Sequence, residues 1–458
     1  MRVTVIGTGY VGAVTGACLA WLGHRVTCVD TNRSRIERLQ AGISPIYEPG
    51  LEDLLRAAAQ RGGLDFATDL AQSVRESDVI FIAVGTPSLP SGEANLMYLE
   101  TAARSIGTAL TAGGKRAGFR VIVNKSTVPV GSGNLVGTLV REGMAGGEQA
   151  EFGVASNPEF LREGSAIHDS FFPDRIVVGA EDGRTLDVMR KLYEPLVEQQ
   201  FAAPQFAPRP PGTRTIPFVA TTLTSAEMIK YSANAFLAMK IGFANEMANI
   251  CEKVGADVTQ VMMGIGLDSR IGPKFLNAGL GWGGSCFGKD IRSLAHTAGE
   301  YGYQARLLET SLAVNDAQRL SVIQKLQERL RILKGRTVAL LGLAFKPDTD
   351  DLRDAPSLQI AARLTQIGVR VRVFDPVAME VCREQNPDLA ITYCASAAEA
   401  CSGADALVLV TEWEEFASLD LAAVAATMNH AVLVDGRNLY DPAAARAAGF
   451  DYCGMGRS

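Results

Sequence analysis

One cysteine in this sequence of 458 residues lies in a loop whose composition favours close contact with a ligand. Cys286 belongs to the segment GWGGSCFGKD (281–290), and glycine backbone can approach a ligand closely although it is costly to order. A thiolate is the usual covalent partner for an aldehyde carbonyl, and the nearby cation of Lys289 favours that charged form. The remaining cysteines are interpreted as small buried apolar residues. We therefore expect Cys286 to be a nucleophile.

Polar residues at two other places have the spacing of a ligand site. Lys230 and Asn234 are four residues apart in a segment without proline, so a helix would present both on one face. Taken alone, this pair is more typical of a solvated helix face. The segment NPEFLREG (157–164) follows a predicted strand, at the end where parallel sheets bind ligands. A carboxylate in this segment can act as a general base, and a helix cap or a surface charge is the alternative.

A glycine fingerprint follows the first predicted strand directly. Gly7, Gly9 and Gly12 belong to GTGYVG, and Asp30 closes the next strand 18 residues after Gly12. Such glycines allow a tight turn, close approach of the backbone to a pyrophosphate, and packing of helix on strand. The carboxylate of Asp30 would hold the adenosine ribose hydroxyls and repel a 2'-phosphate, which predicts NAD rather than NADP as the cofactor. The segment GLAFK (342–346) lacks the full fingerprint, so only one dinucleotide site is expected.

The elements that must position these residues follow two separate rhythms of alternating strands and helices. In the first half of the chain, the predicted strands are 2–6, 24–29, 79–84, 121–124, 152–155 and 175–178. In the second half they are 337–342, 369–374, 406–411 and 431–435. The sequence therefore predicts an α/β protein with two Rossmann-like, doubly wound parallel sheets.

Between these halves the sequence predicts a helical domain. A long helix over 224–254 would begin at a capping box of Thr224 and Glu227, and a second would cover 306–333 with Gly335 as its stop signal. The proline-rich residues 201–217 predict an exposed loop, and Thr111 to Gly118 a surface turn. We expect three domains, at 1–205, 218–325 and 335–458.

Composition and charge exclude several classes of function. Apolar residues make up 47% and charged residues 21%, the balance of an ordinary globular protein. A formal net charge of -6 gives no basic field for a polyanion, so nucleic acid is not an expected partner. No apolar run of about 18 residues is present to span a bilayer, and the eight cysteines form neither a CxxC pair nor a zinc-like cluster. We expect a cytoplasmic protein with reduced thiols, no bound metal and no membrane association.

With these pieces in order, the sequence resembles the UDP-glucose/GDP-mannose dehydrogenase family over essentially its whole length. The resemblance is specific, because many separate motifs occur in the same order. They are GTGYVG (7–12), PIYEPGL (45–51), VGTP (84–87), KSTVP (125–129), NPEFLREGSA (157–166), SAEMIKYSANAF (225–236), GGSCFGKD (283–290) and FKPDTDDLRDAPS (345–357). The family's fold would be two Rossmann-like domains joined by a helical domain with a long central helix.

The resemblance implies a four-electron oxidation of a nucleotide sugar in two steps, with two NAD used for each sugar. The aldehyde would stay in the site between the steps. Cys286 would form a thiohemiacetal, which becomes a thioester after the second oxidation and is then hydrolysed by water.

The resemblance also gives roles to residues around this cysteine. Lys230 and Asn234 would stabilise the oxyanion, and Asp290 would order or activate the hydrolytic water. Glu159 would assist as a general acid or base, with Thr127 holding a water beside it.

The matching positions divide into cofactor and substrate contacts. Besides the glycine fingerprint, those implied for NAD are Val11, Asp30, Arg35, Thr86, Thr127, Glu163, Lys289 and Arg353. Those implied for the nucleotide sugar are Glu159, Phe160, Leu161, Arg162, Lys230, Asn234, Asn277, Gly283, Phe345, Lys346 and Arg437. The third domain would hold the uridine diphosphate. Arg270 would reach into the site of a neighbouring subunit, which implies a homodimer or a higher homo-oligomer.

Some positions depart from the usual family pattern, and alternatives stay open. Trp282 and Gly288 stand where the family usually has Phe and Pro, Asn95 stands where Asp is more frequent, and the 201–217 loop is longer. PIYEPGL and GGSCF resemble the UDP-glucose branch, whereas GDP-mannose and UDP-N-acetylhexosamine dehydrogenases would use the same cysteine. A 3-hydroxyacid dehydrogenase would need no thiol, and a non-catalytic nucleotide-sugar sensor would not need Cys286, Lys230 and Asn234 together.

Overall fold

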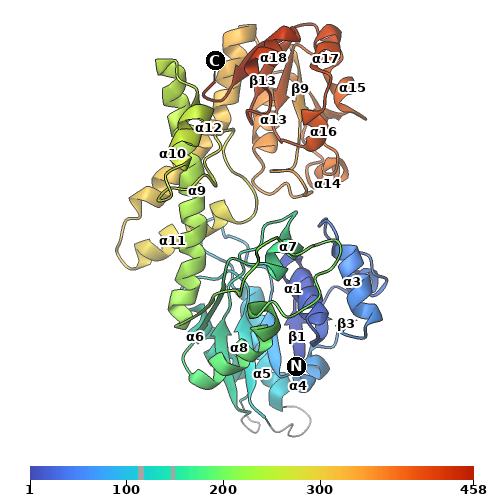
Figure 1. Cartoon of the computed structure of the whole chain (residues 1–458), viewed down its shortest axis with the longest axis vertical. Helices are drawn as coiled ribbons and strands as arrows, with labels where there is room; N and C mark the ends of the chain where they lie inside the picture. Colours follow the sequence, from blue (N-terminus) through green and yellow to red (C-terminus); the bar gives the residue numbers. More distant parts are fainter. Residues whose placement is uncertain (112–117, 146–149, 458) are drawn as a thin grey trace. The chain divides into compact units, whose positions relative to one another are not determined.

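The computed structural model describes residues 1–111, 118–145 and 150–457, so the turn predicted at Thr111 to Gly118 lies largely outside the described residues. The chain divides into two compact units, Met1–Ser232 and Ala233–Ser458. The division falls inside a single helix of 32 residues, α9 (Leu223–Val254). Each unit contains one sheet, and Figure 1 follows their elements along the chain.

The first unit is built on an eight-stranded sheet with the order β3-β2-β1-β4-β5-β6-β7-β8. Neighbouring strands are parallel except β6 and β7. The strands are β1 (Arg2–Ile6), β2 (Arg25–Val29), β3 (Leu64–Ala67), β4 (Val79–Ile82), β5 (Arg120–Asn124), β6 (Phe152–Ser156), β7 (Ile176–Ala180) and β8 (Phe218–Thr221). The central strand β4 has the sequence VIFI and is buried at every residue, as expected when helices cover both faces of a parallel sheet.

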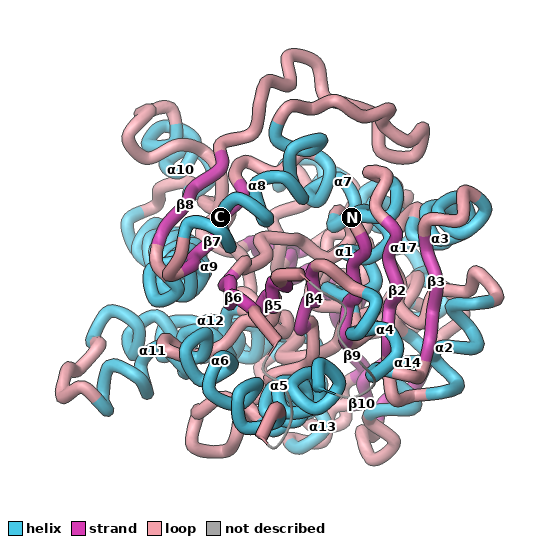
Figure 2. The backbone as a smooth tube through the Cα atoms, turned by 90° about the horizontal axis from the view of Figure 1, so that it is seen from below, coloured by secondary structure: helices cyan, strands magenta, loops and turns pink. Residues whose placement is uncertain are grey.

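Helices pack on both faces of this sheet and enclose two apolar cores. One core joins the sheet to α1, α3, α7 and α8, and the other joins it to α4, α5 and α6. Figure 2 shows α5 and α6 on one side of β4, β5 and β6, with α7 and α8 on the other. The helices of this unit are α1 (Tyr10–Trp21), α2 (Arg33–Gln40), α3 (Leu51–Gln60), α4 (Leu70–Glu76), α5 (Met97–Thr111), α6 (Ser132–Gly143), α7 (Ala166–Phe171) and α8 (Gly183–Val197).

The second unit contains a six-stranded parallel sheet with the order β11-β10-β9-β12-β13-β14. Its strands are β9 (Thr337–Leu341), β10 (Arg370–Phe374), β11 (Ile391–Tyr393), β12 (Ala406–Leu409), β13 (Val432–Asp435) and β14 (Asp451–Gly454). Helices around it are α13 (Pro356–Gln366), α14 (Met379–Gln385), α15 (Ala397–Cys401), α16 (Glu414–Ala417), α17 (Leu421–Thr427) and α18 (Pro442–Ala447). The predicted fold class, with two Rossmann-like parallel sheets and a helical region between them, is confirmed.

The helical region comprises α9, α10 (Val258–Gly266), α11 (Phe287–Glu300) and α12 (Arg306–Leu330). The long helix predicted over 224–254 is present as α9, but its predicted cap was wrong. The hydroxyl of Thr222, not Thr224, accepts the amide N–H of Ser225 at 3.2 Å at the start of α9. The carboxylate of Glu227 binds amides of another segment, described below, so no capping box forms. Helix α12 ends at Leu330 rather than at the predicted residue 333, because Arg331 has a φ of +64°.

The predicted strands correspond to central strands, and the strands that the pattern did not predict are β3, β8, β11 and β14. These are the two edges of each sheet. Edge strands are covered on fewer sides than central ones, so they need no continuous apolar run. In β8, for example, no residue is fully buried. The missing signal therefore has a physical cause.

The proline-rich segment 201–217 forms neither helix nor strand, as predicted, and we call it the strap. Most of its residues are exposed, but contacts at Trp21 help to hold it on the first unit. The indole Nε1 of Trp21 donates to the carbonyl of Ala202 at 2.8 Å. The ring of Phe206 packs edge-on against that indole, with ring centroids 6.2 Å apart. Among the described residues, no helix combines the length and apolarity needed to cross a membrane.

Candidate active site

The glycine fingerprint forms the turn between β1 and α1. Gly7 has φ of +96°, and a Cβ there would lie 2.6 Å from the carbonyl oxygen of Ala83. A Cβ on Gly12 would lie 1.9 Å from the carbonyl oxygen of Gly7, so only glycine allows α1 to start against the turn. An added Cβ on Gly9 would meet no atom within 4 Å. This open backbone and the N-terminus of α1, with Val11 in its first turn, fit the pyrophosphate of a dinucleotide.

Asp30 lies just after β2, beside this turn. Its carboxylate accepts the amide N–H of Thr8 at 2.9 Å and the Thr8 hydroxyl at 2.8 Å, and it pairs with the guanidinium of Arg35 at 3.2 Å. Burial alone would raise the pKa of Asp30, but the amides of Asn32 and Thr8 outweigh it, and Arg35 acts in the same direction, so the pKa is lowered. The predicted ribose acceptor is therefore a charged, oriented carboxylate.

A buried carboxylate that the sequence did not point to joins three of the motifs. Glu48, in PIYEPGL, accepts the Tyr10 hydroxyl and the amide N–H groups of Gly164 and Ala166, both at 2.7 Å. Burial raises the pKa of the Glu48 carboxyl. Glu163, a predicted cofactor contact, directly precedes Gly164 in the loop that is held in this way. Only the tertiary fold brings these residues together, although their motifs were visible.

Glu159 and Lys230 form a buried ion pair, with Lys230 Nζ 2.9 Å from Glu159 Oε1. The second carboxylate oxygen of Glu159 accepts the amide N–H of Leu161 at 2.6 Å. Burial alone would raise the pKa of Glu159, but the attraction of Lys230 outweighs it and the pKa is lowered. Lys230 therefore does not belong to a solvated helix face.

A second buried lysine lies near this pair and was not among the predicted site residues. Lys125, in KSTVP, directly follows β5 and donates to Oδ1 of Asn157 at 3.1 Å. Burial lowers the pKa of Lys125 to about 8, with Lys230 acting in the same direction and Glu159 against it. One buried carboxylate thus interacts with two buried amines. A lysine next to a buried strand end was the available sequence signal.

A small pocket opens at the carboxyl ends of β5 and β6. It includes Thr127, whose carbonyl oxygen accepts the Thr86 hydroxyl at 2.7 Å. It also includes Glu227, whose carboxylate accepts the amide N–H groups of Gly131 and Gly133, both at 2.7 Å, at the start of α6. The lining residues are Asn124, Ser126, Thr127, Val128, Ser156, Pro158, Glu227 and Lys230. The sequence had not predicted that Glu227 would anchor this loop.

The 157–164 segment is less buried after Glu159. The guanidinium of Arg175 stacks 3.7 Å from the ring centroid of Phe160. Leu161 packs at the border of one core of the first unit. Arg162 is exposed and pairs with Asp169 at 2.6 Å. These three predicted substrate contacts therefore lie together on one loop, with Glu159 as its buried start.

In the second unit, Cys286 is the N-cap residue of α11. None of the eight cysteines, all of them among the described residues, forms a disulfide, and Cys286 alone is not buried. Its Sγ lies 3.4 Å from Ser285 Oγ. One turn into the helix, the buried carboxylate of Asp290 accepts Asn234 Nδ2 at 2.6 Å and Lys289 Nζ at 2.7 Å. The structure thus joins Asn234 of α9 to Asp290 and Lys289 in the first turn of α11, whose N-terminal amides favour negative charge near Cys286.

The predicted nucleotide contacts of the second unit surround the glycine loop. Arg437 donates to the carbonyl oxygens of Gly281 at 3.3 Å and Phe345 at 3.2 Å. A Cβ on Gly283 would lie 3.1 Å from the Cβ of Phe345. The ammonium of Lys346 lies 5.6 Å from the ring centroid of Phe345. The structure thus brings these residues together.

Three other predicted contacts have different surroundings. Arg353 pairs with Asp351 at 2.7 Å, and its carbonyl oxygen accepts the amide N–H of Gly284 at 2.9 Å. Asn277 is exposed. Arg270 is also exposed and pairs with Asp268 of its own loop at 2.6 Å. Arg353 is therefore linked to the glycine loop through its backbone.

Two of the noted departures from the family pattern touch each other. A Cβ on Gly288 would lie 3.4 Å from Cζ3 of Trp282, whose ring also meets Phe287 edge-on at 6.0 Å between centroids. A side chain at 288 would first meet the guanidinium of Arg292, 2.9 Å from the added Cβ, so the indole is not its nearest neighbour.

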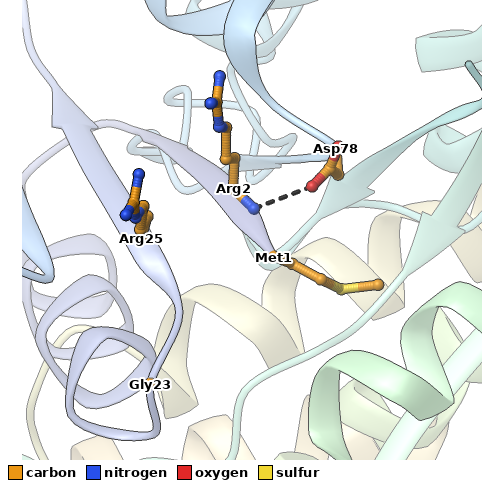
Figure 3. Close-up of a pocket in the computed structure, with 5 residues that line it drawn as sticks. All are labelled: Met1, Arg2, Gly23, Arg25 and Asp78. Atoms are coloured by element: carbon orange, nitrogen blue, oxygen red, sulfur yellow. Dashed lines mark hydrogen bonds between the residues drawn. The ribbon is translucent and has the colours of Figure 1, made fainter.

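A surface pocket also lies at the amino ends of the strands of the first sheet. Met1, Arg2, Gly23, Arg25 and Asp78 line it, and the amide N–H of Arg2 donates to Asp78 at 2.9 Å (Figure 3). These residues lie at the amino ends of β1, β2 and β4, whereas ligands of parallel sheets bind at the carboxyl ends. We assign no role to this pocket.

The glycine turn, the acid after β2 and the parallel sheet define a dinucleotide-binding domain. Residues 1–197 match the NAD binding domain of the UDP-glucose/GDP-mannose dehydrogenase family, residues 224–317 its central domain and residues 339–442 its UDP binding domain. The chain belongs to this family, and its cofactor is NAD.

Relatives cover the whole chain. It is 46% identical to the UDP-glucose 6-dehydrogenase of Rhizobium meliloti, over 100% of both chains. It is 45% identical to the UDP-glucose 6-dehydrogenase YwqF of Bacillus subtilis, over 100% of this chain and 98% of the relative. A solved UDP-glucose dehydrogenase from the archaeon Pyrobaculum islandicum is 39% identical and superposes with a TM-score of 0.89, covering 100% of this chain and 98% of that one.

Proposed function

We propose that the protein is a UDP-glucose 6-dehydrogenase, which oxidises UDP-glucose to UDP-glucuronate with two NAD for each sugar. The full-length similarity to UDP-glucose 6-dehydrogenases supports the substrate. The observation that carries the chemistry is the accessible thiol of Cys286 at the N-terminus of α11, close in sequence to the buried Asp290. When bound, NAD supplies the hydride acceptor.

The chain's own residues would divide the remaining work. The thiol of Cys286 adds to the aldehyde and later carries the acyl group as a thioester. The amine of Lys230 and the amide of Asn234 stabilise the negative oxygen of the tetrahedral adducts. Asp290 orders the water that cleaves the thioester, and Glu159, with Thr127 holding a water, moves protons at the sugar hydroxyl. These roles rest on the resemblance and on the buried polar pairs described above.

The substrate is tested by incubating the protein with NAD and a panel of nucleotide sugars and counting the NADH formed for each sugar consumed. UDP-glucose should give two NADH and UDP-glucuronate. GDP-mannose and UDP-N-acetylhexosamines should turn over far more slowly. Preferred turnover of one of these sugars would assign the chain to another branch of the family, and one NADH per substrate would overturn the four-electron reaction.

The covalent route is tested with Cys286→Ser and Cys286→Ala. An oxygen ester on the introduced hydroxyl would hydrolyse far more slowly than a thioester, so Cys286→Ser should accumulate a sugar adduct, visible in the intact mass. Cys286→Ala should form no adduct and no UDP-glucuronate. Cys251→Ala, a change to a buried cysteine on α9, is the matched control and should keep full turnover. Wild-type turnover by Cys286→Ala would refute the thioester route.

A homodimer or a higher homo-oligomer is part of the proposal. On α9, Phe236, Phe243 and Ile250 are seven residues apart and 62%, 48% and 48% exposed, which makes an apolar stripe that a second copy would cover. Arg270, also exposed, would then complete the neighbour's site. Mixing inactive Arg270→Ala subunits with inactive Cys286→Ala subunits should restore some activity in hybrid oligomers. No recovery after verified subunit exchange would argue against a shared site.

We further propose three functional domains at 1–205, 218–325 and 335–458, for NAD, for the cysteine loop with subunit contacts, and for the UDP-sugar. The three family matches support this division. A cytoplasmic location is supported by the eight described cysteines, none of which is in a disulfide, since reducing compartments keep cysteines as thiols.

A further inference from the structure

The glycine loop before Cys286 contains no helix or strand, yet its backbone groups are paired with buried polar side chains of the second unit. The amide N–H of Gly279 donates to Asn245 Oδ1 at 2.8 Å, and its carbonyl oxygen accepts Gln318 Nε2 at 2.8 Å. Asn249 in turn donates to Gln318 Oε1 at 2.9 Å. Side chains of α9 and α12 thus hold the start of the loop.

The strongest contacts are made at Trp282 by two residues one turn apart on α12. Asn315 accepts the amide N–H of Trp282 at 2.8 Å and donates to its carbonyl oxygen at 3.0 Å. Arg319 donates to the same carbonyl at 2.6 Å and reaches Asp354 Oδ1 at 2.6 Å. Asn315 is 1% exposed and Arg319 is 4% exposed. The backbone N–H and carbonyl groups of Trp282 are therefore both hydrogen-bonded by side chains of α12.

Two glycines of the loop have backbone conformations that fit these contacts. Gly281 has φ of +93°, and a Cβ there would lie 2.5 Å from Asn315 Oδ1. Gly284, two residues before Cys286, has φ of +87° and donates its amide N–H to the carbonyl oxygen of Arg353 at 2.9 Å. Glycine loses the most conformational freedom on ordering, so a glycine loop stays in one conformation only if other groups fix it.

We propose that Asn315 and Arg319 are positioning residues that hold the Cys286 loop in its reactive arrangement before any ligand binds. The two side chains touch neither the thiol nor a proposed ligand group, and they act through the backbone of Trp282. A nucleophile held in place needs no further ordering when the substrate arrives, and a misplacement of about 1 Å can cost on the order of a hundredfold in rate. This inference rests on the proposed role of Cys286.

The test combines steady-state kinetics with amide hydrogen exchange on the full-length protein. Asn315→Leu and Arg319→Met should lower kcat at least about tenfold, because the thiol is then no longer held in place before the substrate binds. Exchange should accelerate in peptides that cover 279–286. Arg319→Lys retains one donor, so it should recover part of the lost kcat and part of the lost protection.

The control is Arg329→Met on the same helix, where an exposed arginine pairs with Asp451. It should change neither kcat nor loop exchange. If Asn315→Leu does not fold, Asn315→Asp serves instead, because it keeps the acceptor for Trp282 N–H, replaces the donor by an oxygen and adds a charge that Arg319 can balance. Wild-type exchange in 279–286 for the folded variants, or an equal loss of kcat in Arg329→Met, would overturn the proposal.

Hydrogen exchange also separates this inference from the proposed function. The proposed function fails if the wild type oxidises another nucleotide sugar or if Cys286→Ala stays active. Even then, faster exchange of 279–286 in the variants would establish that Asn315 and Arg319 hold the loop in place. If the wild type behaves as proposed and the variants lose kcat without any change in exchange, the positioning role fails alone.

Discussion

The two sheets carry the same kind of turn after their first strand, but the acids beside these turns differ. Gly7 and Gly342 have φ of +96° and +101°, and Asp30 and Asp375 each follow the neighbouring strand. Asp375 is 1% exposed and accepts the amide N–H groups of Leu343 at 2.7 Å and of three further residues, Ala344, Val377 and Ala378. It also accepts the indole N–H of Trp413 at 3.1 Å.

The carboxylate of Asp30 has a different set of hydrogen-bond donors. It accepts two backbone amides and the Thr8 hydroxyl, pairs with Arg35, and keeps part of its side chain exposed. Asp375 is fully buried and its two oxygens accept five donors, so no acceptor position is left for a ribose. In Asp30, the oxygen Oδ1 accepts, among the described residues, only the amide N–H of Asn32, which leaves an acceptor position for a ribose hydroxyl. The backbone turn therefore does not decide which ligand binds, and the surroundings of the acid do. This agrees with the expectation of one dinucleotide site and with the UDP binding domain matched at 339–442.

The largest expected effect is on stability, from Asp375→Ala. Each buried donor left without a partner costs about 1–3 kcal/mol, so the loss of an acceptor for five donors should lower the free energy of unfolding by at least about 3 kcal/mol. Urea unfolding, followed by circular dichroism, measures it. Asp30→Ala is the matched control and should lose clearly less. Equal losses would show that the two acids are equivalent supports.

The next effect is on the cofactor, from Asp30→Ala. A hydrogen bond to a charged group contributes about 1.5–3 kcal/mol, so the KM for NAD should rise roughly ten- to a hundredfold. The preference for NAD over NADP should also fall, because the repulsion of a 2'-phosphate is removed and Arg35 loses its partner. Initial rates with both cofactors measure this. Asp375→Asn should keep the wild-type KM for NAD, and an unchanged NAD preference in Asp30→Ala would contradict the role of this carboxylate.

A smaller effect should come from Trp413→Phe, which keeps the ring and removes one donor to Asp375. The free energy of unfolding should fall by about 1 kcal/mol, the typical net contribution of a hydrogen bond. Thermal or urea unfolding of the single variant and of Trp413→Phe combined with Asp375→Ala makes a double-mutant cycle. Fully additive losses would mean that the indole and the carboxylate do not interact energetically.

The smallest effect is a pH dependence at Asp30. Its pKa is lowered in the folded protein, so its charge stabilises the fold above the pKa of the unfolded chain, about 3.9 for Asp. That contribution is lost as the pH falls through the lower, folded pKa. Urea midpoints of wild type and Asp30→Asn should therefore differ near neutral pH and converge in strong acid. A difference that grows toward low pH would reverse the sign of the expected shift.

The sequence predicted much of this architecture because its strongest signals are local. Central strands are continuous apolar runs, and the fingerprint with Asp30 spans only the first two strands. Partners that are far apart in sequence were not predictable in this way. Glu48 contacts Gly164, and Glu227 contacts Gly131, through the tertiary fold alone.

The same limit explains the wrong cap predicted for α9. Glu227 has the spacing of a capping box, yet its carboxylate accepts the amide N–H groups of Gly131 and Gly133 instead. Arg319 gave no signal, because an arginine in the middle of a helix resembles any surface cation until its partner at Trp282 is known. Roles that depend on such distant partners, including those of residues around the cysteine loop, can be inferred only from the tertiary structure.

The strap is a place where the chain could be cut so that its two fragments still associate. Its residues 208–215 are mostly exposed, and the contacts of Trp21 and Phe206 lie before them. After a cut at this point, the second fragment would begin just before β8, which pairs with β7, and would carry the Lys230 and Glu227 contacts to the first. The two pieces would still recognise each other through a strand pairing and a buried ion pair. The molecule is therefore suited to reconstitution from two separately produced fragments, or to new termini at the strap.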